Sequence, residues 1–170
     1  MPAPGEPSSA ASDPLAVLLG YLDFLEDVTL RKIGGLSDGQ LRASVVPSGW
    51  TPLGMLKHLA CTERFWVRHI FLGELVDFSW PGDPDAEWRA DGSDTAERII
   101  AFYRGERAHT RQTVAGLAAG AVGHRGFLED GAGQPPTLGW VLGHLMYQAA
   151  RHAGHLDIAR ELTDGSTGSD

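Results

Sequence analysis

Apolar residues recur at intervals of three and four along four segments of the chain, a spacing that is typical of amphipathic helices. Two segments begin with a clear helix signal, because Asp13 and Thr51 are good N-cap residues and proline follows each of them. No segment shows the alternating pattern of a half-buried β-strand. We therefore predict an all-α protein with one extra turn of helix within residues 37–43. Its four main helices are expected near residues 14–33, 52–72, 94–118 and 137–163.

The connections between these helices differ in length. Residues 74–93 form a long polar loop that contains Trp80 and Trp88, and loops of this length often carry function. The third helix is expected to start at Asp94, because Glu97 three positions later completes an acidic variant of the capping box. A second long connection, rich in glycine, precedes the fourth helix. Four helices with two long connections predict a bundle whose order is not simply up-down-up-down.

The length of the chain sets the number of domains. A chain of 170 residues can bury one sizeable hydrophobic core, and we expect residues 13–163 to form one domain. The flanking segments, residues 1–12 and 164–170, consist mostly of small and polar residues and of proline. Such segments bury too little apolar surface to fold, so both are expected to be disordered tails.

The charge and the apolar stretches exclude several classes of partner. A net charge of −8 is the opposite of what a nucleic-acid binder needs, and an anionic lipid surface would repel it. The longest apolar stretch, residues 15–25, is interrupted by Asp23 and is too short to span a bilayer. The N-terminus lacks the features of a secretory signal. We therefore expect a cytoplasmic protein with neither nucleic-acid nor membrane partners. The single cysteine, Cys61, rules out an internal disulfide and is interpreted as a small core residue.

Two of the seven histidines are predicted to point into the core from different helices. His152 continues an apolar stripe with Ala149 and Leu156, and His58 lies on the buried-looking side of the second helix. A buried imidazole needs a partner for both ring nitrogens, and a metal ion together with a hydrogen-bond acceptor supplies both. Backbone carbonyls could satisfy one such histidine alone. Two inward histidines, with Gln148 one turn before His152, favour a shared site.

The remaining histidines are interpreted differently. His144 and His155 share the polar strip of the fourth helix with Gln148 and His152, but steps of four drift around the helix axis. They are therefore expected at the rim of the site, as second choices for ligation. The other three lie near helix ends or in loops and are expected on the surface: His69, His109 and His124.

The sequence resembles the DinB-like family in two motifs. Residues 50–60 (WTPLGMLKHLA), followed by Glu63 and Trp66, resemble its first signature, and residues 142–161 (LGHLMYQAARHAGHLDIARE) resemble its second. The resemblance covers about residues 13–163 and implies a four-helix bundle. The family includes mycothiol-dependent maleylpyruvate isomerase and bacillithiol transferases. The resemblance also implies a homodimer, since many members of the family pair through helix faces.

The resemblance also implies a divalent metal, usually zinc or nickel. By position, His58 would be the first ligand, Gln148 the middle one and His152 the last, with His144 and His155 as alternatives. The family usually has histidine or glutamate at the middle position. An amide oxygen is a poorer ligand for such metals, so weak binding, or none without added metal, is expected here.

Three functions are consistent with the sequence. The first is a thiol-dependent transferase or isomerase, in which the metal would lower the pKa of a small thiol. The high content of alanine, glycine and arginine suggests a high-GC bacterium and so favours mycothiol as that thiol. The second is a non-catalytic bundle that binds a small ligand or a weakly held metal in a stress or resistance response. The third is a structural bundle with no bound species. No catalytic residue can be assigned from the sequence.

Overall fold

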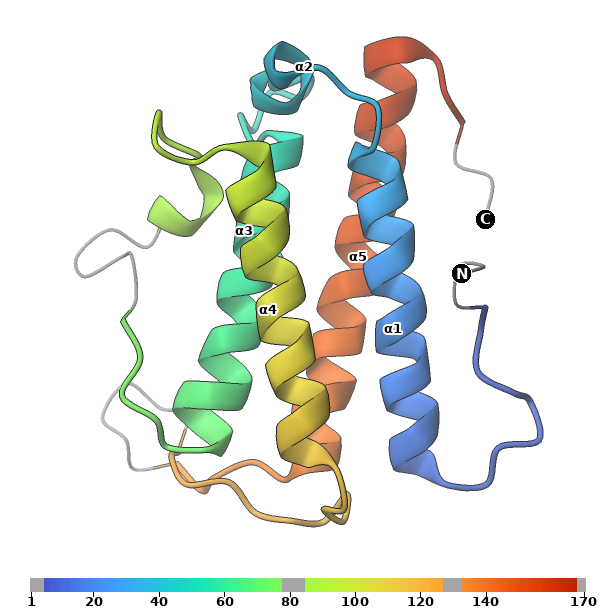
Figure 1. Ribbon diagram of the computed structural model, residues 1–170, viewed down its shortest axis with the longest axis vertical. Coiled ribbons are helices and arrows are strands. Elements are labelled where there is room, and N and C mark those ends of the chain that lie inside the picture. The colour runs from blue at the N-terminus through green and yellow to red at the C-terminus, as the bar shows by residue number, and fades with distance from the viewer. Residues whose placement is uncertain (1–4, 78–84, 127–132, 168–170) are drawn as a thin grey trace.

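The computed structural model, which describes residues 5–77, 85–126 and 133–167, consists of helices joined by loops (Figure 1). An isolated antiparallel bridge joins Val122 to Thr137, and the described residues contain no longer strand pairing. The predicted all-α class is therefore confirmed. The helical elements are α1 (Pro14–Ile33), α2 (Asp38–Arg42), α3 (Pro52–Glu63), η1 (Arg64–Phe71), η2 (Ala86–Trp88), α4 (Ala96–Val114) and α5 (Leu138–Asp164).

The long helices start where their capping residues lie. The side chain of Asp13 accepts a hydrogen bond from the Leu15 amide, and Thr51 accepts one from the Gly54 amide. The predicted start of the third helix at Asp94 is wrong. Thr95 caps α4 instead, because the Asp94 carboxylate is held by the Lys57 ammonium at 2.8 Å.

Two further boundaries differ from the prediction or refine it. The third helix ends at Val114, four residues early, and Gly116 just beyond it has a left-handed backbone with φ of +80°. The helix predicted over 52–72 is continuous, but its second half, η1, is wound as a π-helix. Such widened turns are uncommon and often occur near functional sites.

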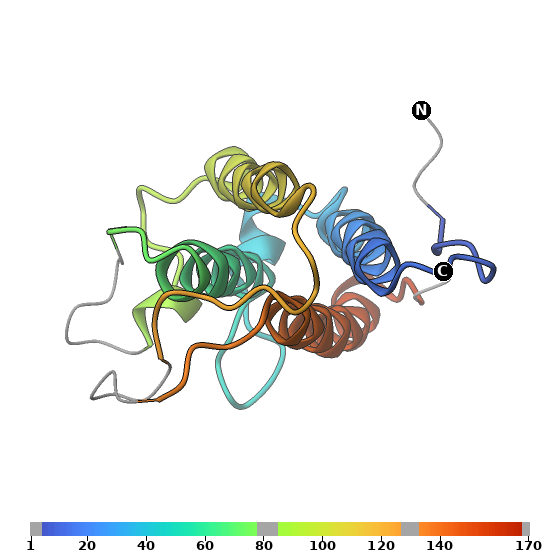
Figure 2. The ribbon, with the colours of Figure 1, turned by 90° about the horizontal axis from the view of Figure 1, so that it is seen from below.

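The long helices α1, α3 with η1, α4 and α5 lie side by side (Figures 1 and 2). In the end-on view of Figure 2, α1 lies beside α5 and α3 lies beside α4. The consecutive long helices α1 and α3 make few contacts with each other, so the order around the bundle is not that of a simple up-down-up-down arrangement. α3 is buried at every position except Lys57, because it packs against α1, α4 and α5. Side chains on α3 therefore reach the centre of the molecule.

A cluster of charged groups lies inside the bundle. Arg107 of α4 is only 1% exposed and donates to Glu63 of α3 at 2.7 Å and to Asp23 of α1 at 2.9 Å. Burial raises the pKa of Glu63, while Arg107 and the Thr110 hydroxyl act in the opposite direction. The cluster ties three helices together. Removing one partner would leave a buried charge unpaired, at a cost of about 3–5 kcal/mol.

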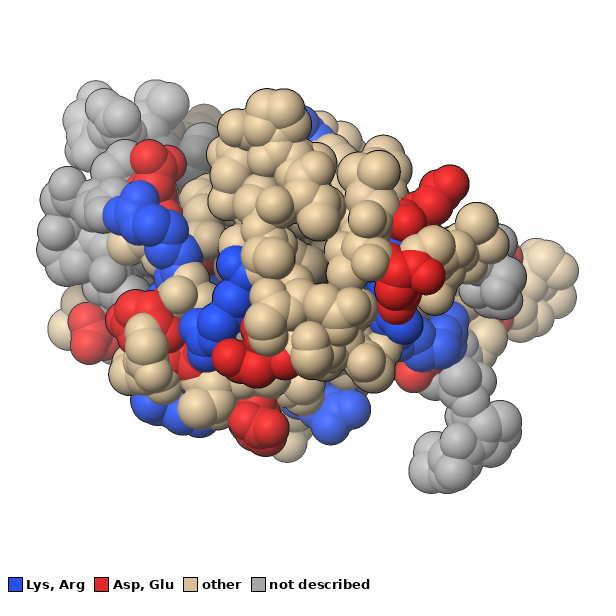
Figure 3. Space-filling model, turned by 90° about the horizontal axis from the view of Figure 1, so that it is seen from above, with Lys and Arg blue, Asp and Glu red and all other residues tan. Residues whose placement is uncertain are grey.

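The surface is mixed in charge where it can be seen. On the end of the molecule shown in Figure 3, acidic and basic side chains are interspersed around a region of uncharged residues. In the described part of the chain, no helix is both long enough and apolar enough to cross a membrane.

Candidate functional site

The structure brings His58 of α3 and His152 of α5 together. Their ring centroids lie 5.0 Å apart and the ring planes are nearly perpendicular, at 85°. Both residues are buried, with 7% and 5% of their surface exposed. The apolar stripe that points His152 inward is the one seen in the sequence, and His58 lies on a helix that is buried at every position except Lys57. The two helices therefore present two imidazoles to one small volume of the core.

A short loop element completes the surroundings of His58. Glu87 of η2 places Oε1 2.9 Å from His58 Nδ1, and the Trp88 indole stacks on the imidazole at 3.6 Å between centroids. Because a carboxylate can only accept, the proton of the imidazole is assigned to Nδ1. Nε2 then keeps its lone pair, and Thr62 Oγ1 lies 3.5 Å from it. The long loop 74–93 was expected to carry function, but no pattern in the sequence indicated Glu87 within it.

The η2 element is held tightly against α3. Lys57 donates to the Arg89 carbonyl oxygen at 2.9 Å and to the Asp94 carboxylate at 2.8 Å. Gly54 lets the Trp88 carbonyl approach the helix so closely that a Cβ at position 54 would collide with it. These contacts fix the position of Glu87 and Trp88 above His58.

The polar strip of α5 divides into two groups. His155 places Nδ1 3.2 Å from His152 Nδ1, so this histidine joins the pair at the site. Gln148 instead places Nε2 3.4 Å from Nε2 of His144, whose ring stacks on Trp140 at 5.2 Å between centroids. The described hydrogen-bond contact of the Gln148 amide is therefore with His144, about two turns away from His152.

The surroundings of His152 and His144 on α5 favour the neutral imidazole. Burial, followed by the nearby His58, His155 and Arg151, lowers the pKa of His152 to about 4. Burial also lowers the pKa of His144. At neutral pH these rings are uncharged, which is the form that accepts a proton or binds a metal.

The donor atoms present can be compared with the needs of a metal ion. His58 and His152 supply two adjacent imidazoles, and Glu87 orients one of them as acidic partners commonly do for ligating histidines. Within residues 5–77, 85–126 and 133–167, however, no group of three His, Cys, Asp or Glu side chains is arranged to hold a metal. In the ligand set expected from the sequence, the amide of Gln148 would be the third donor. The ligand set His58, Gln148 and His152 thus stays a prediction.

The other candidate residues lie away from this centre. Burial raises the pKa of the Cys61 thiol to about 12, so this core residue is protonated at neutral pH and unsuited to act as a nucleophile. His69 and His109 were expected on the surface but are partly buried, because both contact Glu74. His124 is exposed, as expected.

Comparison with known proteins places the chain in a family. The family model described as mycothiol S-transferase matches residues 17–165. The chain belongs to the mycothiol S-transferase family. This family is DinB-like, in agreement with the resemblance seen in the two sequence motifs.

One solved structure supports the fold independently. A conserved protein from Enterococcus faecalis superimposes with a TM-score of 0.65, covering 92% of this chain and 100% of its own at 14% identity. At this identity the likeness shows the fold alone. A search of curated proteins gave no match.

Proposed function

We propose that this protein is an enzyme that transfers the thiol of mycothiol to an electrophilic small molecule. The observation that carries the proposal is the Glu87–His58 pair, buried beside a neutral His152, in a chain of the mycothiol S-transferase family. A carboxylate that orients an imidazole in an apolar site is a common arrangement for activating a nucleophile. The partner would be a small-molecule thiol. The proposal does not name the electrophile that receives it.

The residues support a simple proton transfer. The lone pair on His58 Nε2 would accept the proton of the thiol as the sulfur attacks an electrophilic carbon. A carbon–sulfur bond forms, the bond to the leaving group breaks with its electron pair, and the imidazolium returns the proton to that group. Glu87 stabilises the imidazolium through Nδ1, and the Trp88 indole excludes water from one face of the ring.

A divalent metal would serve the same reaction. We propose His58, Gln148 and His152 as its ligands, with His155 as the alternative that already contacts His152, and His144 as the more remote one. In that case His58 would ligate through the same Nε2 lone pair. Bound zinc or nickel would lower the pKa of a coordinated thiol.

The proposal is tested by measuring conjugation of mycothiol to an electrophilic reporter such as monobromobimane. We expect His58→Gln to lower kcat/KM at least about 100-fold, the usual effect of losing a general base. Glu87→Gln should lower it about 10–100-fold, because the ring loses its orientation. Glu161→Gln, on the exposed side of α5, is the matched control and should match wild type.

Metal content per chain, measured on protein purified without a histidine tag, accompanies the assay. Equal rates for wild type and His58→Gln would overturn the proposal. Tight binding of mycothiol without turnover would favour the non-catalytic bundle instead.

A further inference from the structure

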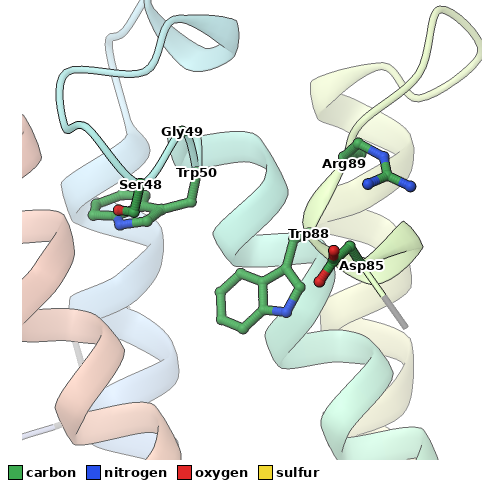
Figure 4. A pocket seen from close by; sticks show the side chains of 6 residues that line it. All are labelled: Ser48, Gly49, Trp50, Asp85, Trp88 and Arg89. Atoms are coloured by element: carbon green, nitrogen blue, oxygen red, sulfur yellow. The ribbon is translucent and has the colours of Figure 1, made fainter. Parts of the chain in front are cut away.

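A cavity of about 420 Å³ opens next to the histidine site (Figure 4). Its walls come from the loop before α3 and from the η2 region, which meet at the start of α3. Trp88 belongs both to this cavity and to the site, because its indole stacks on His58 at 3.6 Å. The lining residues are Ser48, Gly49, Trp50, Asp85, Trp88 and Arg89.

The chemistry of the lining indicates the class of ligand. Two indole side chains offer flat apolar faces, and one acid and one base of opposite charge lie beside them. Asp85 accepts hydrogen bonds, Arg89 donates them, and the Ser48 hydroxyl does both. A wall with balanced charge suits an uncharged ligand with many hydroxyl groups better than an anion or a cation. The volume lies within the range of small-molecule sites.

The cavity is also held in shape before any ligand arrives. Lys57 fixes the Arg89 backbone, and Gly54 lets the Trp88 backbone lie against α3. On the other side, Gly49 has a φ of +84° and shapes the turn that presents Ser48 and Trp50. A preformed cavity lowers the entropic cost of binding.

We infer that this cavity binds the amino-sugar and inositol part of mycothiol. Mycothiol carries its cysteinyl thiol on an uncharged, polyhydroxylated pair of rings. With those rings between Trp50 and Trp88, the thiol end would reach past Trp88 to His58. This inference rests on the proposed function and adds a determinant of thiol specificity. The cavity selects the sugar, and the histidine site acts on the sulfur.

The kinetic test uses the ratio of kcat/KM for mycothiol to kcat/KM for N-acetylcysteine, which has the thiol but no sugar. Ser48→Trp fills the cavity from an exposed position and should lower this ratio at least tenfold. Trp50→Leu keeps an apolar side chain but removes an aromatic face, and should lower the ratio in the same direction. A general structural defect would lower both rates together. Ser9→Trp, exposed and outside the cavity, is the control.

A binding test separates this inference from the proposed function. Thiol-free N-acetylglucosaminyl-inositol, which is uncharged like the corresponding part of mycothiol, should bind wild-type protein by calorimetry and should fail to bind Ser48→Trp. Transfer of mycothiol with an unchanged ratio in Ser48→Trp, and no binding of the thiol-free sugar, would overturn the inference and leave the function intact. Sugar binding that Ser48→Trp abolishes, in a protein without transfer activity, would support the cavity assignment while the function fails.

Discussion

The imidazole of His152 is a buried titratable group that the fold keeps neutral. Its pKa falls from 6.5 to about 4, with burial as the largest cause. Between these two values the unfolded chain binds more protons than the folded one, so stability must fall as pH drops through that window. The loss by pH 4 should be on the order of 3 kcal/mol, because each pKa unit corresponds to about 1.4 kcal/mol.

Urea unfolding of metal-free protein between pH 7 and pH 4 measures this loss. His152→Phe keeps a ring of similar size without the titration, so its stability should fall less steeply over the same range. Parallel pH profiles for the two proteins would show that another group is responsible.

In the proposed ligand set, Gln148 would limit how strongly a metal binds. Its amide oxygen carries only a partial charge, so Gln148→Glu should raise the affinity for zinc at least tenfold. Calorimetric zinc titration measures the change, with exposed Gln112→Glu of α4 as the control. The Gln148 amide contacts His144 in the structure. If it keeps this contact in the metal-bound protein, Gln148→Glu would not raise the affinity for zinc. Unchanged affinity together with a lower Tm would show that Gln148 does not face the metal and would favour His155 as third ligand.

The sequence predicts the position of some site residues in the fold but not of others. The inward position of His152 follows from helical periodicity, because it continues a buried stripe of α5, whereas His58 is buried because α3 is buried at every position except Lys57. Glu87 could not be found in this way. It lies 29 positions from His58 in a loop that has no periodic pattern. The buried Arg107–Glu63 pair was missed for a related reason, since a charged residue on a helix is normally expected to face solvent.

At the scale of elements, the contact between η2 and α3 shapes the site. Gly54→Ala would place a methyl group against the Trp88 carbonyl, so η2 would have to move away from the helix. We expect Glu87 and Trp88 to separate from His58, and kcat/KM to fall about as far as in Glu87→Gln. Tryptophan fluorescence should report the lost stacking of Trp88 on His58.

Another helical glycine provides the matched control for this variant. Gly105 of α4 has open space around its Cβ position, and Gly105→Ala should stabilise the protein by about 0.4–1 kcal/mol without loss of activity. If Gly54→Ala kept full activity and unchanged fluorescence, the close approach of η2 would not be needed to position Glu87.

Element boundaries could be predicted where the capping chemistry is local. The starts of α1 and α3 follow from an N-cap residue and the proline after it, and both match the structure. The start of α4 was misplaced because Asp94 has a tertiary partner, Lys57, that a local pattern cannot reveal. The π-helical winding of η1 also depends on packing, since an apolar period alone does not distinguish it from an α-helix.

At the scale of the whole molecule, one outer face of α5 carries exposed apolar side chains. Trp140, Tyr147 and Ile158 are each more than half exposed and fall on the same side of the helix at its 3.6-residue period. Leu162 extends this face and is also exposed. Exposed apolar faces of this kind often mark contacts between proteins. They locate the surface on which the homodimer expected from the sequence can be tested.

We predict that the protein is a dimer paired about a twofold axis through this face of α5, so that the same residues meet from both copies. Light scattering after gel filtration should give twice the chain mass of 18.2 kDa. Tyr147→Glu combined with Ile158→Glu should yield monomers, because each dimer would then bring four acids into one apolar contact. Leu117→Glu, at an exposed position beyond the end of α4, is the control and should remain dimeric. Wild-type protein that stays at the mass of one chain at about 100 µM would contradict the prediction and leave this face to another partner.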